Sequence, residues 1–423
     1  MHAPFSSRVS TVAAIGLSAA ALGGVTATVA SAGEPPNSPT LYVNGALSAY
    51  DSPVPAPAAS SYVGDRHHGP RHGLGRCASA PYATIGAAVA AATTPGTHIV
   101  VCPGIYREGV TVAMSLDIEG IQATVDATGN PNGFTLMPPA VGTTIKGFTI
   151  ENAVGEGVLA LNTSDVSILD NTVQHNDKGV GKAKTTPECE PGPENPFPDC
   201  GEGVHLMGTS NSEIVGNTIR DNSGGVLMTD ETGPTAGNVV AHNQVLDNTE
   251  DCGITLAGHN PAAAPGGTPN PKAAGVYGNL IKDNVAEGNG VAGQGAGILL
   301  AAGIPIGGGA VYDNTVSGNL LKENGLAGVT LHNHVANQDL NGNRIVHNRI
   351  GTNNVDGDPD FFPVVDKETT GIFVGTAGSP LSITIEHNVI YSNHFGIFLT
   401  GPMSTEQIKH NHFFEVTTDV FGP

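Results

Sequence analysis

The chain has no tryptophan and few basic side chains, and both shortages limit its partners. Its 423 residues include 17 Lys and Arg against 38 Asp and Glu, which gives a formal net charge of −21. Nucleic-acid binding needs a basic patch to neutralise phosphates, so we expect no nucleic-acid partner. The same charge disfavours a naked polyanion such as pectate unless Ca²⁺ bridges it. Because only 5% of the residues are aromatic, a stacking platform for sugars is not expected.

Apolar runs long enough to span a bilayer are missing after the first 32 residues. Arg8, the apolar stretch 12–29 and the small residues 30–32 predict a Sec-type signal peptide over residues 1–32. A transmembrane anchor is the alternative, but the stretch is rich in Ala, Gly and Thr instead of Leu. We therefore expect a secreted, extracellular monomer with no membrane span after signal cleavage.

Cysteine is scarce, with five residues in the chain. Export permits disulfides. Cys77 and Cys102 flank a predicted N-terminal cap, and Cys189 and Cys200 flank an acidic, Pro-rich loop, so the sequence predicts these two pairs. Cys252 is left over and is expected to be a buried free thiol. Residues 33–76 are rich in Pro, Ser and Ala, a composition typical of a disordered linker.

Glycine and asparagine are abundant, and they recur in a fixed phrase. Asn-x-(Val/Ile)-x-x-Asn is followed by a glycine and a short alternating apolar run, and glycines such as Gly157, Gly179, Gly203, Gly225 and Gly253 return at intervals of 22 to 28 residues. A period of this length is typical of a solenoid whose repeats bury apolar surface against their neighbours. Alternation in runs of three to five residues predicts strands and excludes a helical solenoid.

The predicted fold is all-β: a single-stranded right-handed parallel β-helix over residues 77–423, with a short capping helix in residues 84–92. Asn and Gly are expected at the corners because both tolerate positive φ. Equivalent asparagines would then stack in ladders about 4.8 Å apart. Residues 41–43 can add a strand to the first coil.

Two stretches near the cap, together with the Asn/Gly coils, carry a family resemblance. They are Tyr82-Ala-Thr-Ile85 and Pro103-Gly-Ile-Tyr-Arg-Glu108. With these residues the sequence resembles the pectin-lyase-like superfamily of right-handed parallel β-helix proteins, in the style of its secreted NosD-type and carbohydrate-binding or sugar-hydrolysing members. The resemblance implies action on an extracellular polysaccharide or cell-surface glycan, as a lyase, epimerase or hydrolase.

The sequence departs from the enzymes of that superfamily in its motifs. The acidic and Gly-His-Gly motifs of polygalacturonases are missing, and Gly258-His259-Asn260 is the nearest fragment. The arginine motif of classical pectate lyases is missing too. The copper role attached to NosD-type relatives implies clustered soft ligands, whereas the six Met are scattered along the chain.

The coil glycines provide reference positions from which the remaining acids and histidines can be aligned on successive coils. Residues at similar offsets on successive coils should share one line, and this predicts an acid–base or metal-binding group composed of Asp230, Glu231, Asp251, His259, His332 and His334. The alternative is that these are solvated turn residues. Separately, Asp356, Asp358 and Asp360 form a loop that could chelate Ca²⁺, the one cofactor considered, unless it is simply a solvated acidic loop.

Two functional hypotheses follow. The first is a secreted polysaccharide-active enzyme that uses this line of Asp, Glu and His. The second is a non-catalytic surface or binding β-helix, in which loops carry recognition. Because the fold hosts both, membership of the fold class cannot choose between them.

Overall fold

The computed structural model describes residues 38–45, 74–179, 200–258, 274–302, 309–335, 338–359, 366–376, 380–401, 403 and 407–422. The chain divides into two compact units, Met1–Asn37 and Ser38–Pro423, and every described residue belongs to the second. The predicted signal peptide and most of the predicted linker lie outside the described residues. Neither helix within the described ranges has the length and apolar character needed to cross a bilayer.

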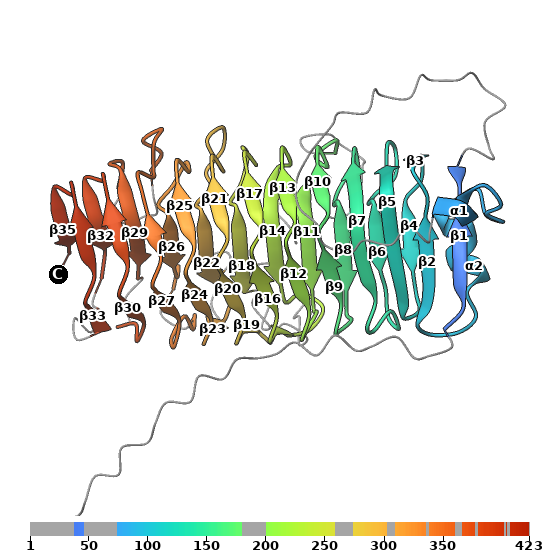
Figure 1. Ribbon diagram of the computed structural model, residues 1–423. Coiled ribbons are helices and arrows are strands. Elements are labelled where there is room, and N and C mark those ends of the chain that lie inside the picture. Colours follow the sequence, from blue (N-terminus) through green and yellow to red (C-terminus); the bar gives the residue numbers. More distant parts are fainter. Residues whose placement is uncertain are drawn as a thin grey trace, which may run out of the picture. The chain divides into compact units, whose positions relative to one another are not determined.

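The second unit is the predicted parallel β-helix, a stack of coils whose strands pair with equivalent strands one coil away (Figure 1). Sheet B, with eleven strands, forms one side; sheet A, with twenty-one, contains two rows that meet at a corner; sheet C has three short strands.

The strands of sheet B are β4 (Val110–Val112), β6 (Phe134–Leu136), β8 (Val158–Leu161), β11 (Glu202–Met207), β14 (Gly224–Thr229), β18 (Ile254–Gly258), β22 (Ile298–Ala302), β26 (Val329–His332), β29 (Thr370–Gly375), β32 (Phe395–Leu399) and β35 (Thr418–Phe421). Those of sheet A are β1 (Thr40–Val43), β2 (Thr97–Val101), β3 (Gly104–Tyr106), β5 (Leu116–Asp126), β7 (Thr144–Glu151), β9 (Ser167–Leu169), β10 (Thr172–Gln174), β12 (Glu213–Val215), β13 (Thr218–Arg220), β16 (Val239–Ala241), β17 (Gln244–Leu246), β20 (Leu280–Lys282), β21 (Val285–Glu287), β24 (Thr315–Ser317), β25 (Leu320–Lys322), β27 (Arg344–Val346), β28 (Arg349–Ile350), β30 (Thr384–Glu386), β31 (Val389–Tyr391), β33 (Ile408–Lys409) and β34 (His412–Phe414). Sheet C contains β15 (Thr235–Ala236), β19 (Val276–Tyr277) and β23 (Val311–Tyr312).

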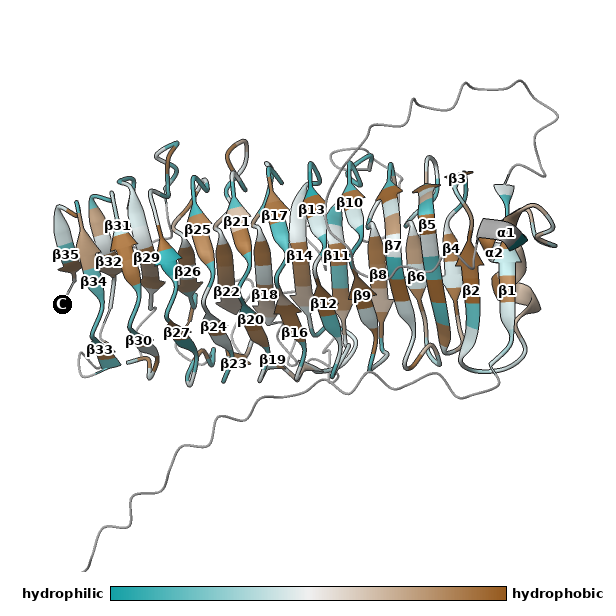
Figure 2. Cartoon of the chain, in the orientation of Figure 1, coloured by the Kyte–Doolittle hydropathy of each residue, from teal (hydrophilic) through white to brown (hydrophobic). Residues whose placement is uncertain are grey.

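The core runs along the inside of the coils, where alternate strand residues meet. In β14, Val226 and Met228 point inward and pair in register with Ile254 and Leu256 of the next coil. Inward residues of this kind are buried in every coil, and the strands show as apolar bands in Figure 2. Burial of each aliphatic side chain contributes about 1.5–3 kcal/mol, so the stack is held by apolar packing repeated coil by coil.

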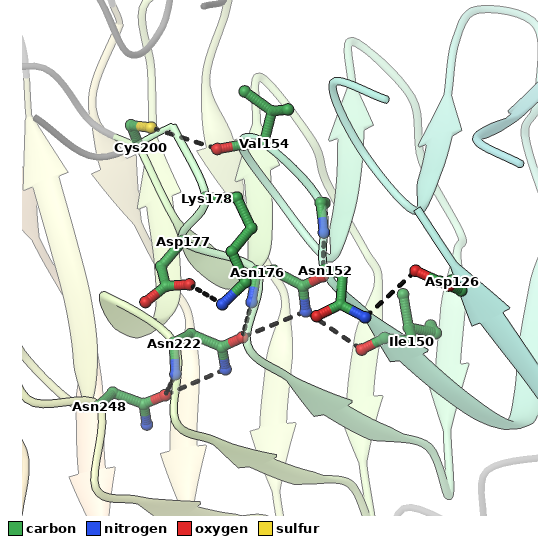
Figure 3. A network of polar contacts seen from close by, with 11 residues as sticks. Asp126, Ile150, Asn152, Val154, Asn176, Asp177, Lys178, Cys200, Asn222 and Asn248 are labelled. Atoms are coloured by element: carbon green, nitrogen blue, oxygen red, sulfur yellow. Dashed lines mark hydrogen bonds and ion pairs between the residues drawn. The ribbon is translucent and has the colours of Figure 1, made fainter. Parts of the chain in front are cut away.

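Asparagine ladders line the inside of the corners. In one of them Asn176, Asn222 and Asn248 are linked because each side-chain Nδ2 donates to the Oδ1 of the next, at 3.1 and 3.0 Å (Figure 3). Each Oδ1 also accepts the backbone N–H of the preceding asparagine, as between Asn176 and Asn222 at 3.0 Å. The ladders provide hydrogen-bond partners for the polar backbone groups at the bends, and buried backbone groups need such partners.

The conformational reason given for these asparagines was wrong. Positive φ belongs to the residue just before the ladder asparagine, for example His175 at 57°, Asp221 at 55° and Asp247 at 54°. That residue faces outward and lets the chain turn, while the asparagine points inward and provides the hydrogen bonds. The turn conformation and the inward hydrogen bonds, both predicted for the asparagine, therefore belong to two neighbouring positions.

The glycines that open the sheet B strands serve a different purpose as well. They do not adopt positive φ; instead, a Cβ on Gly225 would lie 2.2 Å from the carbonyl oxygen of Gly253 and 2.4 Å from Val245. A Cβ on Gly203 would likewise lie 2.3 Å from Cγ2 of Ile219. Close approach of backbone and core, not turn geometry, selects glycine here.

The N-terminal cap forms as expected and extends further than predicted. Helix α2 (Ile85–Ala91) begins after Thr84, and a four-residue helix α1 (Leu74–Cys77) precedes it. The N–H groups of Ile85 and Gly86 donate to the carboxylate of Glu108 at 2.8 and 2.9 Å, which caps α2. The predicted Cys77–Cys102 disulfide is present.

Residues 40–43 lie in the stretch predicted as a linker, and the strand that the sequence allowed at residues 41–43 is present. They form β1, which pairs with β2 in the register Thr40↔His98 to Val43↔Val101, because Leu41 and Val43 add apolar contacts to the first coil. Cys200 is also in a disulfide. Its predicted partner, Cys189, lies outside the described residues.

Candidate functional site

Four of the predicted site residues lie along the edge where the sheet B strands end. Asp230 and Glu231 directly follow β14, His332 is the last residue of β26, and His334 follows two residues later. Strand β26 is three coils from β14, or about 14 Å at the usual strand spacing. The acids and the two histidines therefore share an edge without being adjacent.

His259 lies outside the described residues, so its predicted contact with Glu231 stays a prediction. The register of the two strands is defined, because Thr229 pairs with Ala257.

Asp251 does not join this edge. It precedes β18 at the opposite end of the strands, and its backbone N–H donates to the carbonyl of Ser223, just before β14. Asp230 follows β14, so a full strand of about 20 Å separates the two carboxylates. Asp251 precedes its coil glycine, Gly253, whereas Asp230 follows Gly225, so the two residues belong to opposite strand ends although both lie near a coil glycine in sequence.

The environment of the two histidines limits their chemistry. Their rings meet edge to face with centroids 5.0 Å apart. Burial, with a smaller effect of His334, lowers the pKa of His332 from 6.5 to about 3; burial also lowers the pKa of His334. A general acid or base works best with a pKa near the operating pH, so His332 is poorly suited to proton transfer near neutrality.

The sequence reasoning missed a second polar group on sheet B, formed by Glu156, Glu202, His205 and Thr229. His205 lies between the inward-facing Val204 and Leu206, so its ring points to the outer face. Its Nδ1 is 3.7 Å from Oε1 of Glu156, and its Nε2 is 2.8 Å from Oγ1 of Thr229. An imidazole thus stands between a carboxylate and a hydroxyl.

The two carboxylates of this acid–imidazole group come from neighbouring coils. Strand β8 pairs with β11 in the register Val158↔Val204, which brings Glu156 level with Glu202. The N–H of Glu202 donates to Oε2 of Glu156 at 2.8 Å. Exposed fractions are 1% for Glu156, 3% for Glu202 and 0% for His205. Burying two carboxylates is costly, so such a group needs either compensating partners or a function that maintains it.

A signal for this group was present in the sequence. Glu156 and Glu202 each stand immediately before a coil glycine, Gly157 and Gly203, so their equal offsets from these glycines align them on the coils. The residues of the predicted edge group follow their coil glycines, except for Asp251, whereas Glu156 and Glu202 precede theirs.

Cys252 is buried and free, as predicted. Burial raises the pKa of its thiol well above the usual value, and the nearby Asp251 carboxylate adds to the effect. The thiol sulfur accepts the N–H of Ala296 at 3.1 Å. A thiol that stays protonated is a poor nucleophile, so Cys252 is a packing residue.

The proposed Ca²⁺ loop is described in part. The N–H of Asp358 donates to Oδ1 of Asp356 at 3.1 Å, and burial raises the pKa of Asp356. Asp360 lies outside the described residues. Across the described ranges no group of three or more His, Cys, Asp or Glu side chains is arranged to hold a metal ion.

Two family models match the chain, each over less than half of it. Residues 126–264 match the right-handed β-helix region, and residues 308–421 match the periplasmic copper-binding protein NosD. Among the described residues no group of three or more His, Cys, Asp or Glu side chains is arranged to hold a metal ion, so the structure gives no support to the copper role in the second description. No curated protein matches the sequence.

Solved structures resemble the coils at low identity. The Dettilon tailspike protein matches at 14% identity and TM-score 0.44 over 75% of this chain, which spans 62% of the tailspike. A pectate lyase matches at 18% identity and TM-score 0.40, over 73% of each chain. The A-module of an Azotobacter vinelandii mannuronan C-5 epimerase matches at 16% identity and TM-score 0.42, over 80% of this chain and 93% of the module. No activity is inferred from these likenesses. The coil registers and the β-helix family match together identify the fold: the chain forms a right-handed parallel β-helix.

Proposed function

We propose that this protein hydrolyses glycosidic bonds in an extracellular polysaccharide, with Glu156 and Glu202 as its pair of catalytic carboxyl groups. The observation that carries the proposal is the juxtaposition of two buried carboxyl side chains from neighbouring coils with the imidazole of His205. Export through the predicted signal peptide of residues 1–32 would bring the protein to such a substrate.

The chemistry of the acid–imidazole group suits this reaction. Glycosidases generally use two carboxyl groups, one that protonates the leaving oxygen and one that acts as base or nucleophile. Burial favours the protonated form of a carboxyl group, which a general acid needs. His205 contacts both Glu156 and Thr229 and would hold the Glu156 carboxyl group in position.

Hydrolysis fits this surface better than a lyase or epimerase reaction on uronates. Those reactions require positive charge close to the substrate carboxylate. The eleven strands of sheet B contain no Lys or Arg within the ranges that the structure describes. A neutral polysaccharide, or one whose carboxylates are bridged by Ca²⁺, is the substrate class that this acidic surface would accept.

The test is turnover of a panel of neutral and uronate oligosaccharides by the full chain, with and without Ca²⁺. We expect hydrolysis by the wild type, and a loss of kcat of about a hundredfold or more in Glu156→Gln and Glu202→Gln. The matched control is Glu213→Gln, which removes a half-buried carboxylate from sheet A. Wild-type turnover that survives in both variants would refute the assignment. The variants Glu231→Gln and His334→Asn in the same assay test the edge group predicted from the sequence.

The second candidate function is a non-catalytic glycan-binding or surface β-helix. The observation in its favour is the low exposure of the acid–imidazole group, since a substrate must reach groups that are 0–3% exposed. Under this reading, the wild type binds members of the panel and turns over none of them.

A further inference from the structure

Three exposed histidines form a stacked row at a corner of sheet A, far from the acid–imidazole group in sequence and on a different sheet. The rings of His347 and His387 have centroids 5.0 Å apart and an interplanar angle of 9°. Those of His387 and His410 are also 5.0 Å apart, at 11°. We call His347, His387 and His410 the imidazole ladder.

The coil frame explains why the rings stack. Each member precedes a ladder asparagine, respectively Asn348, Asn388 and Asn411, and adopts the positive φ of that position, 59°, 59° and 57°. The strands before the corner pair in register, β27 with β30 and β30 with β33, and so do those after it, β28 with β31 and β31 with β34. Equivalent outward side chains are therefore repeated at the spacing of the coils.

The imidazole ladder is not a general property of this corner. The same position in earlier coils holds Asp170, Gly216, His242, Asp283 and Gly318. A continuous row of imidazoles begins at His347 and extends over the last three coils. Corner geometry alone accepts Asp or Gly, so it does not account for three successive histidines.

The surroundings of the imidazole ladder are basic, in contrast to the acidic chain. Arg344 and Lys409 are about half exposed, and both contact Glu386, at 3.4 and 3.7 Å. Arg349 and His412 are exposed on the strands that follow the corner. The group has three permanent positive charges, on Arg344, Arg349 and Lys409, against the one carboxylate of Glu386.

We propose that the imidazole ladder and its flanking Arg344, Arg349 and Lys409 bind a carboxylate-bearing acidic polysaccharide. The proposal does not depend on catalysis at sheet B. A straight row of evenly spaced N–H donors on a rigid solenoid fits an extended polymer with repeating carboxylates, which would accept charge-assisted hydrogen bonds. Stacked imidazoles repel one another once they are protonated. A ligand that is anionic at acidic to neutral pH would reduce this repulsion, which adds to its binding free energy. Binding should therefore tighten as the pH falls.

Other anionic partners fit less well. A duplex nucleic acid carries phosphates on two strands, and one narrow row of side chains would contact only part of them. An anionic membrane favours a broad basic face with apolar anchors. A single extended chain needs only the row itself.

Binding of polygalacturonate to the full-length protein tests the proposal, measured at about pH 5.5 and about pH 7.5. The test variant carries His347→Asn, His387→Asn and His410→Asn, because Asn tolerates positive φ and does not titrate. We expect the wild type to bind about tenfold or more tightly at the lower pH, with salt weakening the complex. The triple variant should lose this pH dependence and most of the affinity.

Two controls keep the result interpretable. His175→Asn replaces an exposed histidine that has the same backbone conformation, φ 57°, at a corner outside the ladder, and it should bind as the wild type does. Thermal unfolding of each variant shows that the coils remain folded. Wild-type affinity in the triple variant, equal binding of fully methyl-esterified polygalacturonate, or tighter binding of anionic vesicles or DNA would each overturn the proposal.

Discussion

The histidines of sheet B and those of the imidazole ladder occupy the same repeating frame but have different surroundings. His205 and His332 stand on sheet B, and burial lowers the pKa of His332 to about 3. His347 and His387 stand at an exposed corner among basic side chains. A solenoid repeats backbone positions, and the depth of each position decides whether an imidazole contacts other buried side chains or faces solvent and a possible ligand.

The corner shows the same contrast between adjacent residues. His347 faces solvent, while Asn348 is fully buried and bonded to the coils on both sides. Its Oδ1 accepts from Asn319, and its Nδ2 donates to Asn388 and to the carbonyl of Val316, all at 3.0 Å. Stability should therefore depend on the inward residue, and binding on the outward one.

The largest effect is expected for Asn348→Ala. This change leaves several buried donors and acceptors without partners, so the free energy of unfolding should fall by about 3 kcal/mol or more. Chemical denaturation followed by circular dichroism measures the loss. A decrease below about 1 kcal/mol would show that water or relaxed backbone replaces the ladder bonds.

An intermediate effect is expected for the pH dependence of stability. Because the folded pKa of His332 lies below its unfolded value near 6.5, the unfolded state binds the extra proton first as pH falls. The stabilisation is complete above about pH 6.5 and is lost progressively towards pH 3. In His332→Gln the loss of stability between pH 7 and pH 4 should shrink by roughly 2–3 kcal/mol.

Denaturation curves at several pH values measure this difference. His412→Gln, which removes an exposed histidine, should leave the pH dependence unchanged. Identical slopes for His332→Gln and the wild type would mean that His332 is solvated in the folded state.

The smallest effect is expected for His387→Asn, the middle member of the imidazole ladder. Its ring is exposed and Asn keeps the positive φ, so the free energy of unfolding should change by less than about 0.5 kcal/mol. A loss approaching that of Asn348→Ala would show that ring stacking supports the fold, and would erase the contrast between the inward and outward residues of the corner.

Much of the fold could be predicted from the repeat. Period, alternation and the capping stretch led to the β-helix, the α2 helix, β1 and the Cys77–Cys102 disulfide, because each depends on local pattern or close sequence signals. The roles of Asn and Gly could be predicted less well from the sequence, because inward and outward positions at a tight bend alternate irregularly. Only the coordinates show that positive φ precedes the asparagine.

The candidate site was predicted less well, for a geometric reason. Offsets from a glycine align residues along the stack but do not say to which end of a strand they belong. Asp251 was therefore grouped with Asp230 although a strand separates them, while Glu156 and Glu202 were overlooked. Their contact with His205 depends on side-chain direction, which spacing does not define.

The sequence by itself determined the solenoid, because a recurring apolar face that each repeat cannot bury alone has one solution, stacking. It also determined the acidic character and the corner residue types. The tertiary structure decided which of those residues meet. Glu156 and His205 are 49 residues apart, as the sequence shows, and become neighbours because β8 and β11 pair in one register. The three rings of the imidazole ladder stack for the same reason, since coil register converts distant positions into one row.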